Sequence, residues 1–195
     1  MSPSLPAVGF KEWSLVCSAL GSGAQSVILR KGGIHEGRGG FWWRHGSFFL
    51  FPTQFHEQTL QFPWQPPSSG PVEPPTPSPE EGGHLLQYFA EVEQKWQITE
   101  WQTVQRLKPL HFWTEGTLRE RFDYSEATGI SLSFLRVYRL SEPWVFPDER
   151  RFGGCRSWLD LPAVPENLQL SPVLDDAAHR EVADKLMQLM EIPAD

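Results

Sequence analysis

The chain has 195 residues, of which 39% are hydrophobic and 13% aromatic, and its formal net charge is −7. This length suits one domain, and the apolar content is enough to build a core. No run of 18 apolar residues is present, which argues against a membrane-spanning helix. The opening stretch MSPSLPAVGFKEW lacks the basic-then-apolar form of a signal peptide. The cysteines are only Cys17 and Cys155, which argues against a disulfide framework, and we expect a cytoplasmic protein.

The first half of the chain alternates strand-like and irregular stretches. Residues 10–20 fit either a short helix or a buried strand, and we favour the helix. Residues 27–29 form a β-rich run that glycines end, so they predict a strand. The consecutive apolar residues 48–51 predict a further strand that is covered on both faces. Eight prolines between Pro63 and Pro79 predict a mobile, polyproline-like loop over residues 63–83.

The second half of the chain is predicted to mix helices and strands. Residues 84–97 carry an apolar stripe at helical spacing and predict an amphipathic helix, whereas residues 98–113 alternate imperfectly and predict a strand. Thr114 is the expected N-cap of a short helix through Phe122. Residues 129–140 alternate cleanly and predict a strand, and residues 142–161 predict a strand, a charged turn and a second short strand. Residues 171–192 predict a C-terminal amphipathic helix.

These elements predict one α+β domain over residues 1–195. Its sheet is expected to be mixed and largely antiparallel, and it could curl into a partial barrel. Three to four helices would accompany the sheet, and the proline-rich segment would lie outside it as a loop.

The acidity of the chain is concentrated in two parts. Residues 65–100 and 161–195 together carry 3 Lys and Arg against 13 Asp and Glu, whereas residues 1–64 and 101–160 carry 14 against 11. The two aromatic-rich blocks are therefore mildly basic. This balance admits an anionic ligand, although a domain that binds duplex DNA is usually far more basic.

Two adjacent cations, Arg30 and Lys31, precede a glycine pair. Backbone near glycine can approach a ligand closely, and two cations beside it suit a phosphate or a carboxylate. The known phosphate-loop patterns are absent. A hairpin turn with solvated charges remains the alternative.

Histidines and one cysteine are the other candidates for chemistry. His56 and His111 could act as acid and base, with Glu36 as a third candidate residue, because imidazole titrates near neutrality. Their spacing is not diagnostic of a metal site, and a structural role remains open for each. Cys155 precedes Arg156, so it is a candidate nucleophile; a small buried cysteine in a tight turn is the alternative.

Several consecutive motifs resemble an uncharacterised bacterial family, domain of unknown function 1802, which is frequent in cyanobacteria. They are KEWSLVCSALGSGAQSVILRKGGIHEG, FFLFPTQFHEQ, HFWTEGTLRERFDY, LRVYRLSEPW and FGGCRSW. The resemblance covers nearly the whole chain except the proline-rich insert and the end of the tail. It implies the following motif positions: Lys11, Glu12, Arg30, Lys31, Glu36, His56, His111, Arg121, Arg156 and Trp158. Polar residues inside apolar motifs suit a shared pocket.

The leading hypothesis is a binding module for an anionic ligand. Cations would hold the anion and a tryptophan, Trp113 or Trp158, would form a stacking wall, so a nucleotide or a single-stranded nucleic acid is the expected ligand. The four cations are Arg30, Lys31, Arg121 and Arg156.

Two other functions remain open. A phosphoester or amide hydrolase would use His56 and His111 as acid and base, with Glu36 as orienter or metal ligand. A protein-interaction component would use the proline-rich segment and the acidic tail helix. The sequence assigns no residues as metal ligands and does not identify a cofactor.

Overall fold

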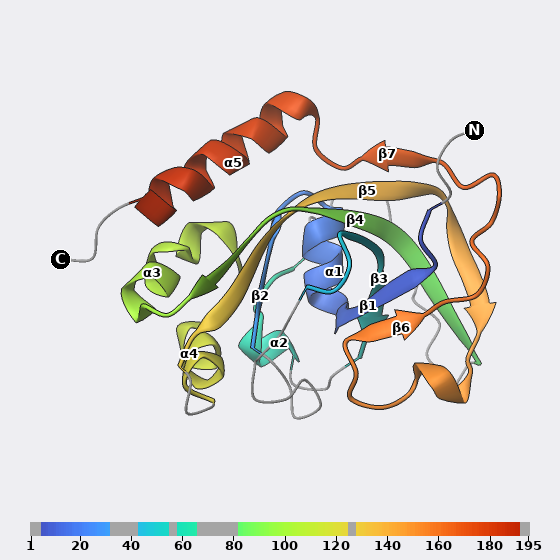
Figure 1. The fold of residues 1–195 in the computed structure, drawn as a ribbon, viewed down its shortest axis with the longest axis horizontal. Coiled ribbons are helices and arrows are strands. Elements are labelled where there is room, and N and C mark those ends of the chain that lie inside the picture. Colours follow the sequence, from blue (N-terminus) through green and yellow to red (C-terminus); the bar gives the residue numbers. More distant parts are fainter. Residues whose placement is uncertain (1–4, 32–42, 55–57, 66–81, 125–127, 192–195) are drawn as a thin grey trace.

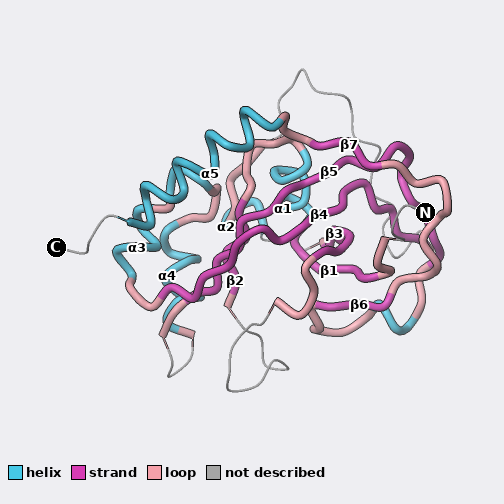
Figure 2. Tube along the Cα trace, turned by 45° about the horizontal axis from the view of Figure 1, so that its top comes forward, coloured by secondary structure: helices cyan, strands magenta, loops and turns pink. Residues whose placement is uncertain are grey.

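The computed structural model describes residues 5–31, 43–54, 58–65, 82–124 and 128–191. The fold is α+β, as predicted, with a seven-stranded sheet among the described residues. The strand order is β2-β5-β4-β3-β1-β6, and β7 also pairs with β5. Only the β1–β3 pairing is parallel in this part of the chain, so the sheet is mixed, mostly antiparallel and open. Figure 2 shows β5, β4, β3, β1 and β6 side by side in this order, with β7 next to β5.

The strands differ greatly in length. The short ones are β1 (Val8–Trp13), β2 (Val27–Arg30), β3 (Ser47–Thr53), β6 (Trp158–Asp160) and β7 (Leu170–Pro172). The long central pair is β4 (Gly83–Ile98) and β5 (Ile130–Pro147). The register of this pair shifts between Leu86 and Tyr88 and again between Val92 and Gln94. Such irregularities increase the bend and twist of a strand, and Figure 1 shows both strands curving across the molecule.

Five α-helices lie within the described residues: α1 (Ser14–Gly21), α2 (Gln58–Gln61), α3 (Trp101–Arg106), α4 (Glu115–Asp123) and α5 (Asp176–Glu191). Short 3₁₀ turns, η3 (Lys108–Leu110) and η4 (Arg150–Phe152), accompany them. Helix α1 packs on β1 and β3, whereas α3, α4 and α5 gather at one end of the sheet (Figure 1).

Two sequence-based predictions of element type are wrong. Residues 84–97 form β4 rather than a helix. The two register shifts interrupt the strict alternation of a strand, so apolar positions recur at intervals of three and four residues, as they would in a helix. Residues 98–113 contain α3 and η3 rather than a strand. Trp101, Val104 and Leu107 are spaced by three, which is the spacing of one helix face.

The other elements follow the sequence pattern more closely. Both interpretations of residues 10–20 apply, because β1 ends at Trp13 and α1 begins at Ser14. The Thr114 hydroxyl accepts a hydrogen bond from the Thr117 amide and caps α4, as predicted. The C-terminal helix begins later than expected, at Asp176, because residues 170–172 form β7. Most of the proline-rich segment, residues 66–81, lies outside the described residues.

The core has two parts that share β3. Phe48 and Leu50 belong to the larger cluster, with α1 and β2. Phe49 and Phe51 belong to a smaller cluster, with the N-terminal half of β4 and the C-terminal half of β5. Successive side chains of a strand point to opposite faces. The run of four apolar residues in β3 is therefore covered on both faces, as its sequence predicts.

Side chains connect strands that the backbone ladder leaves far apart. Arg30 ends β2 at one edge of the strand order, yet its guanidinium donates to the Lys11 carbonyl on β1 at 2.8 Å and to the Ser157 hydroxyl at 3.0 Å. Ser157 immediately precedes β6 at the other edge of the order. The curved sheet thus brings its two ends together around one polar region.

Candidate functional site: a cavity lined by cations

A cavity of about 440 Å³ opens where the ends of several elements meet. Its walls come from β1, from the end of β2, from the end of β3, from α4 and from the loop between η4 and β6. We call it the cationic cavity. Its lining residues are Lys11, Glu12, Trp13, Arg30, Lys31, Thr53, Arg121, Gly154, Cys155 and Arg156. This volume lies within the range of small-molecule sites in proteins.

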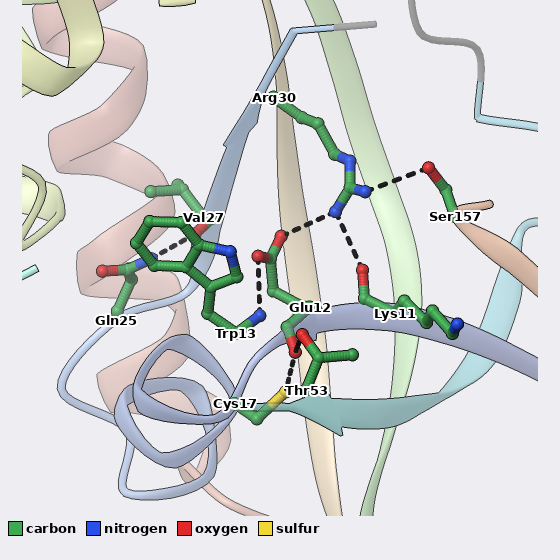
Figure 3. Close-up of polar contacts among 9 residues, drawn as sticks. All are labelled: Lys11, Glu12, Trp13, Cys17, Gln25, Val27, Arg30, Thr53 and Ser157. Carbon is green, nitrogen blue, oxygen red and sulfur yellow. Dashed lines mark hydrogen bonds and ion pairs between the residues drawn. The ribbon is translucent and has the colours of Figure 1, made fainter. Parts of the chain in front are cut away.

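An ion pair between Glu12 and Arg30 holds one side of the cavity. Glu12 is only 4% exposed, and its carboxylate accepts a hydrogen bond from Arg30 at 3.1 Å and one from the Trp13 backbone amide at 2.9 Å. Figure 3 shows Arg30 descending from β2 between Glu12, the Lys11 carbonyl and Ser157. With these partners, Arg30 has a fixed position and acts as part of the wall.

The two lysines are tied to backbone carbonyls. Lys11 Nζ donates to the Gly154 carbonyl at 2.9 Å, and its side chain points away from Glu12 (Figure 3). Lys31 Nζ donates to the carbonyls of Phe122 and Gly129 at 3.2 and 3.0 Å. Burial lowers the pKa of both amines, and the neighbouring Arg156 lowers that of Lys11 further. Lowered amine pKa values mean that the partial dehydration of these cations outweighs the attraction of the nearby negative charges.

Arg121 lies between two tryptophan rings. Its guanidinium carbon is 3.7 Å from the centroid of the Trp113 ring and 5.0 Å from that of Trp13. Burial lowers the pKa of Arg121 to about 10; the charge of Glu12 opposes this shift and that of Arg30 adds to it. Its guanidinium makes no hydrogen bond to any of the described residues. The face of an aromatic ring attracts a guanidinium cation, but it accepts no hydrogen bond from the N–H donors, which point outward in the plane of the guanidinium. The donors of Arg121 are therefore available to a ligand.

The cavity therefore carries a strong excess of positive charge. Among the described residues, five cationic side chains line it against one carboxylate, Glu12, which already pairs with Arg30. This contrasts with the formal net charge of −7 for the whole chain. Arg156 and Cys155 are exposed at its mouth, so the interpretation of Cys155 as a buried cysteine is wrong. Low-dielectric walls around charges of one sign focus the field on the cavity.

The four cations expected to hold an anion, Arg30, Lys31, Arg121 and Arg156, all line this one cavity. The two expected stacking residues do not. Trp113 is 1% exposed and lies behind Arg121, and Trp158 packs on Phe10 and Phe48 in the core. Among the described residues, the tryptophan that lines the cavity is Trp13, which sequence analysis missed although it directly follows the motif residues Lys11 and Glu12.

Of the predicted acid–base residues, the structure describes His111, which does not line the cationic cavity. His111 instead lines a separate cavity of about 140 Å³, formed by α3, η3 and α4. Its imidazole is buried, neither ring nitrogen has a hydrogen-bond partner among the described residues, and burial lowers its pKa to about 3, with Lys108 adding to the shift. His56 and Glu36 lie outside the described residues. The expected convergence of His111 with the cations is therefore wrong.

Two further properties concern metals and membranes. The described residues contain no group of three or more His, Cys, Asp or Glu side chains that could hold a metal ion. Within the same residues, no helix is both long and apolar enough to span a membrane.

The fold and this site define the protein as an α+β domain with a cation-lined cavity where the ends of a curved, open sheet come together. The chain belongs to the family described as domain of unknown function (DUF1802), whose model matches residues 9–185.

Solved structures include distant likenesses to this chain. The crystal structure of ASCH from Zymomonas mobilis is 14% identical, with a TM-score of 0.41, covering 91% of this chain and 93% of that chain. A mutant of the same protein is 14% identical, with a TM-score of 0.43, covering 92% and 98%. No protein with a curated description matches the sequence.

Proposed function

We propose that the cationic cavity binds the phosphate of a nucleotide, either free or within a single-stranded nucleic acid. The observation that carries this proposal is the state of Arg121. This guanidinium is partly buried, stacks on Trp113 and has no hydrogen-bond acceptor among the described residues, so its in-plane donors can meet an anion. Charge-assisted hydrogen bonds from arginine to phosphate are short and strong, and the planar fork matches the phosphate oxygens.

The rest of the cavity supports the same ligand class. Arg156 at the mouth adds a cation that neither pairs with a carboxylate nor donates a hydrogen bond among the described residues, and the amines of Lys11 and Lys31 lie within the walls. Trp13 supplies an aromatic surface on the same wall. Cations beside an aromatic side chain are what a nucleotide requires, because the phosphate is charged and the base is planar.

The hydrolase and protein-interaction hypotheses stay predictions. For a hydrolase, His111 lies in a different cavity, and His56 and Glu36 lie outside the described residues. For protein interaction, most of the proline-rich segment also lies outside them. The described geometry favours neither over anion binding.

The test is equilibrium binding of nucleoside monophosphates and of fluorescent single-stranded 12-mers of DNA and RNA to the full chain. Arg156→Ala removes an exposed charge at the mouth, and Arg180→Ala removes an exposed charge on α5, away from the cavity. We expect Arg156→Ala to weaken binding about tenfold, the loss of one charge-assisted contact, and Arg180→Ala to leave it unchanged. Oligonucleotide binding should also weaken about tenfold between 50 and 300 mM salt if two phosphates are neutralised. The proposal fails if no nucleotide or strand binds, or if both variants behave alike.

A further inference from the structure

A second cavity adjoins the cationic cavity and shares part of its wall. It measures about 320 Å³, and Lys11 and Thr53 line both. Gly153 lines the second cavity and its neighbour Gly154 lines the first. The two cavities therefore adjoin at Lys11 and Thr53, and one ligand that extends past Lys11 can reach both.

The adjoining cavity has a different chemical character. Lys11 and Arg150 contribute positive charge, and Asp148 and Glu149 contribute an equal negative charge. The cationic cavity has a surplus of positive charge, whereas this one is balanced. A balanced, polar cavity suits an uncharged group that carries hydrogen-bond donors and acceptors.

The floor of the adjoining cavity is apolar and partly aromatic. Phe51, Pro52 and Phe152 line it. Both phenylalanines belong to the smaller core cluster and are almost fully buried. Such a floor favours a flat, partly apolar group over a hydrated ion.

Asp148 is held in place at the rim by a histidine that sequence analysis did not single out. His84 Nε2 and Asp148 Oδ1 are 2.6 Å apart. The His84 ring is fixed in turn by Phe51 and Phe152, with ring centroids at 4.6 and 5.4 Å. The Asp148 side chain remains 40% exposed. A carboxylate offers about four acceptor positions, so the bond to His84 leaves several of them for a ligand.

Resting on the proposed function, we infer that the adjoining cavity receives the nucleobase of the nucleotide whose phosphate lies in the cationic cavity, and that Asp148 selects bases with adjacent N–H donors. Guanine presents an imino N–H and an amino group side by side, which a carboxylate accepts together. Uracil presents one imino N–H between two carbonyl oxygens, and these oxygens repel a carboxylate. The preferred ligand is therefore a guanine nucleotide, free or within a single strand.

The experiment compares inorganic phosphate, GMP and UMP by calorimetry with the full chain. GMP is expected to bind about tenfold more tightly than UMP, the discrimination typical of one paired contact to a base edge. A 12-mer of uridines with one central guanosine, set against an all-uridine 12-mer, asks whether the same preference operates within a strand. If the protein prefers GMP over UMP but does not distinguish the two 12-mers, the ligand is a free nucleotide. If it distinguishes the two 12-mers by a larger factor than GMP and UMP, the ligand is a single strand.

Asp148→Asn keeps the side-chain shape and removes the carboxylate. It should abolish the preference for GMP over UMP without weakening the binding of inorganic phosphate. Asp160→Asn on β6 changes an exposed carboxylate that lines neither cavity and should retain the preference. Should Asp148→Asn fail to fold, the wild-type comparison of GMP with UMP still decides. Equal affinity for the two nucleotides, with Arg156→Ala weakening both, overturns this inference and leaves the proposed function standing. No binding of any nucleotide overturns both.

Discussion

The carboxylate of Glu12 and the guanidinium of Arg30 lie 3.1 Å apart, although their strands are separated by three others in the order of the sheet. Glu12 is 4% exposed and Arg30 is 22% exposed at the side chain. The pair therefore fixes the curvature of the sheet at the point where the cationic cavity opens. It is a structural element of the cavity as well as part of its lining.

Glu12→Gln should destabilise the fold. The substitution leaves a largely buried guanidinium without its carboxylate, and the free energy of unfolding is expected to fall by about 2 kcal/mol. Urea denaturation at neutral pH measures this change. Arg151→Gln removes an exposed pair with Glu149 and should cost less than about 0.5 kcal/mol. Equal small losses in the two variants would mean that the Glu12–Arg30 pair does not hold the sheet.

His111 should make the fold sensitive to acid. Its pKa is about 3 in the folded protein and 6.5 in its ordinary state, so the unfolded chain binds a proton that the folded chain excludes. The stability that His111 contributes by staying neutral is fully present above pH 6.5 and is lost as the pH falls toward 3. At pH 4 the loss from this group is about 3 kcal/mol relative to pH 7.

Urea denaturation of wild type and His111→Phe at pH 7 and pH 4 isolates this contribution, because the other acid-titrating groups are common to both. Phenylalanine keeps a ring in the pocket and cannot bind a proton. The variant should lose about 3 kcal/mol less than wild type between the two pH values. His45→Gln, at an exposed imidazole, should follow the wild type. An equal acid response in His111→Phe and wild type would show that His111 is not the group responsible.

Two glycines should respond to alanine in opposite directions. A Cβ on Gly21, at the end of α1, would fall within the ring of Tyr88, which is buried and 5.0 Å from the Arg139 guanidinium. A Cβ on Gly116 in α4 would meet no heavy atom within 4 Å beyond its own helix backbone and chain neighbours. Gly21→Ala should lower the unfolding free energy by about 2–3 kcal/mol through overpacking. Gly116→Ala should raise it by about 0.5 kcal/mol, since alanine favours helix. Thermal denaturation ranks the stability of wild type and the two variants. A Gly21→Ala variant as stable as wild type would contradict the packing of Tyr88 on α1.

The sequence predicted the elements whose signals are local. The β-rich run before Gly32 forms β2, and the Thr114 hydroxyl caps α4, because strand content and an N-cap depend on a few adjacent residues. The type of β4 was not predictable in the same way. Its apolar residues follow helical spacing, and only pairing with β3 and β5 on either side makes it a strand. Tertiary contacts decide such segments over local pattern.

The candidate site shows the same division. Arg30, Lys31, Arg121 and Arg156 stand out in the sequence as cations within apolar motifs, and the fold brings them to one cavity. Trp13 and Asp148 were missed. Residue type alone did not set Trp13 apart from the other eight tryptophans. The Asp148 carboxylate is positioned by its contact with His84, 64 residues earlier in the chain. Contacts over such separations carry no signal in a single sequence.

Cys155 should report occupancy of the cationic cavity. It is exposed and lines the cavity, whereas Cys17, the other of the two cysteines, is buried. Iodoacetamide should therefore modify Cys155 much faster than Cys17, as mass spectrometry can measure for each thiol. Inorganic pyrophosphate, at constant ionic strength, should slow the modification of Cys155. At ten times its Kd about one tenth of the sites stay free, so the rate should fall about tenfold.

The matched variants of the binding test make this protection specific. In Arg156→Ala, the same protection of Cys155 should require more pyrophosphate, because this variant lacks a cation at the mouth of the cavity. In Arg180→Ala, pyrophosphate should protect Cys155 as well as it does in wild type. A rate that stays constant as pyrophosphate is raised would mean that no anion occupies the space beside Cys155. Equal protection in Arg156→Ala and wild type would mean that Arg156 does not help to hold the anion. Either result would contradict the assignment of Arg121 and Arg156 to one anion site.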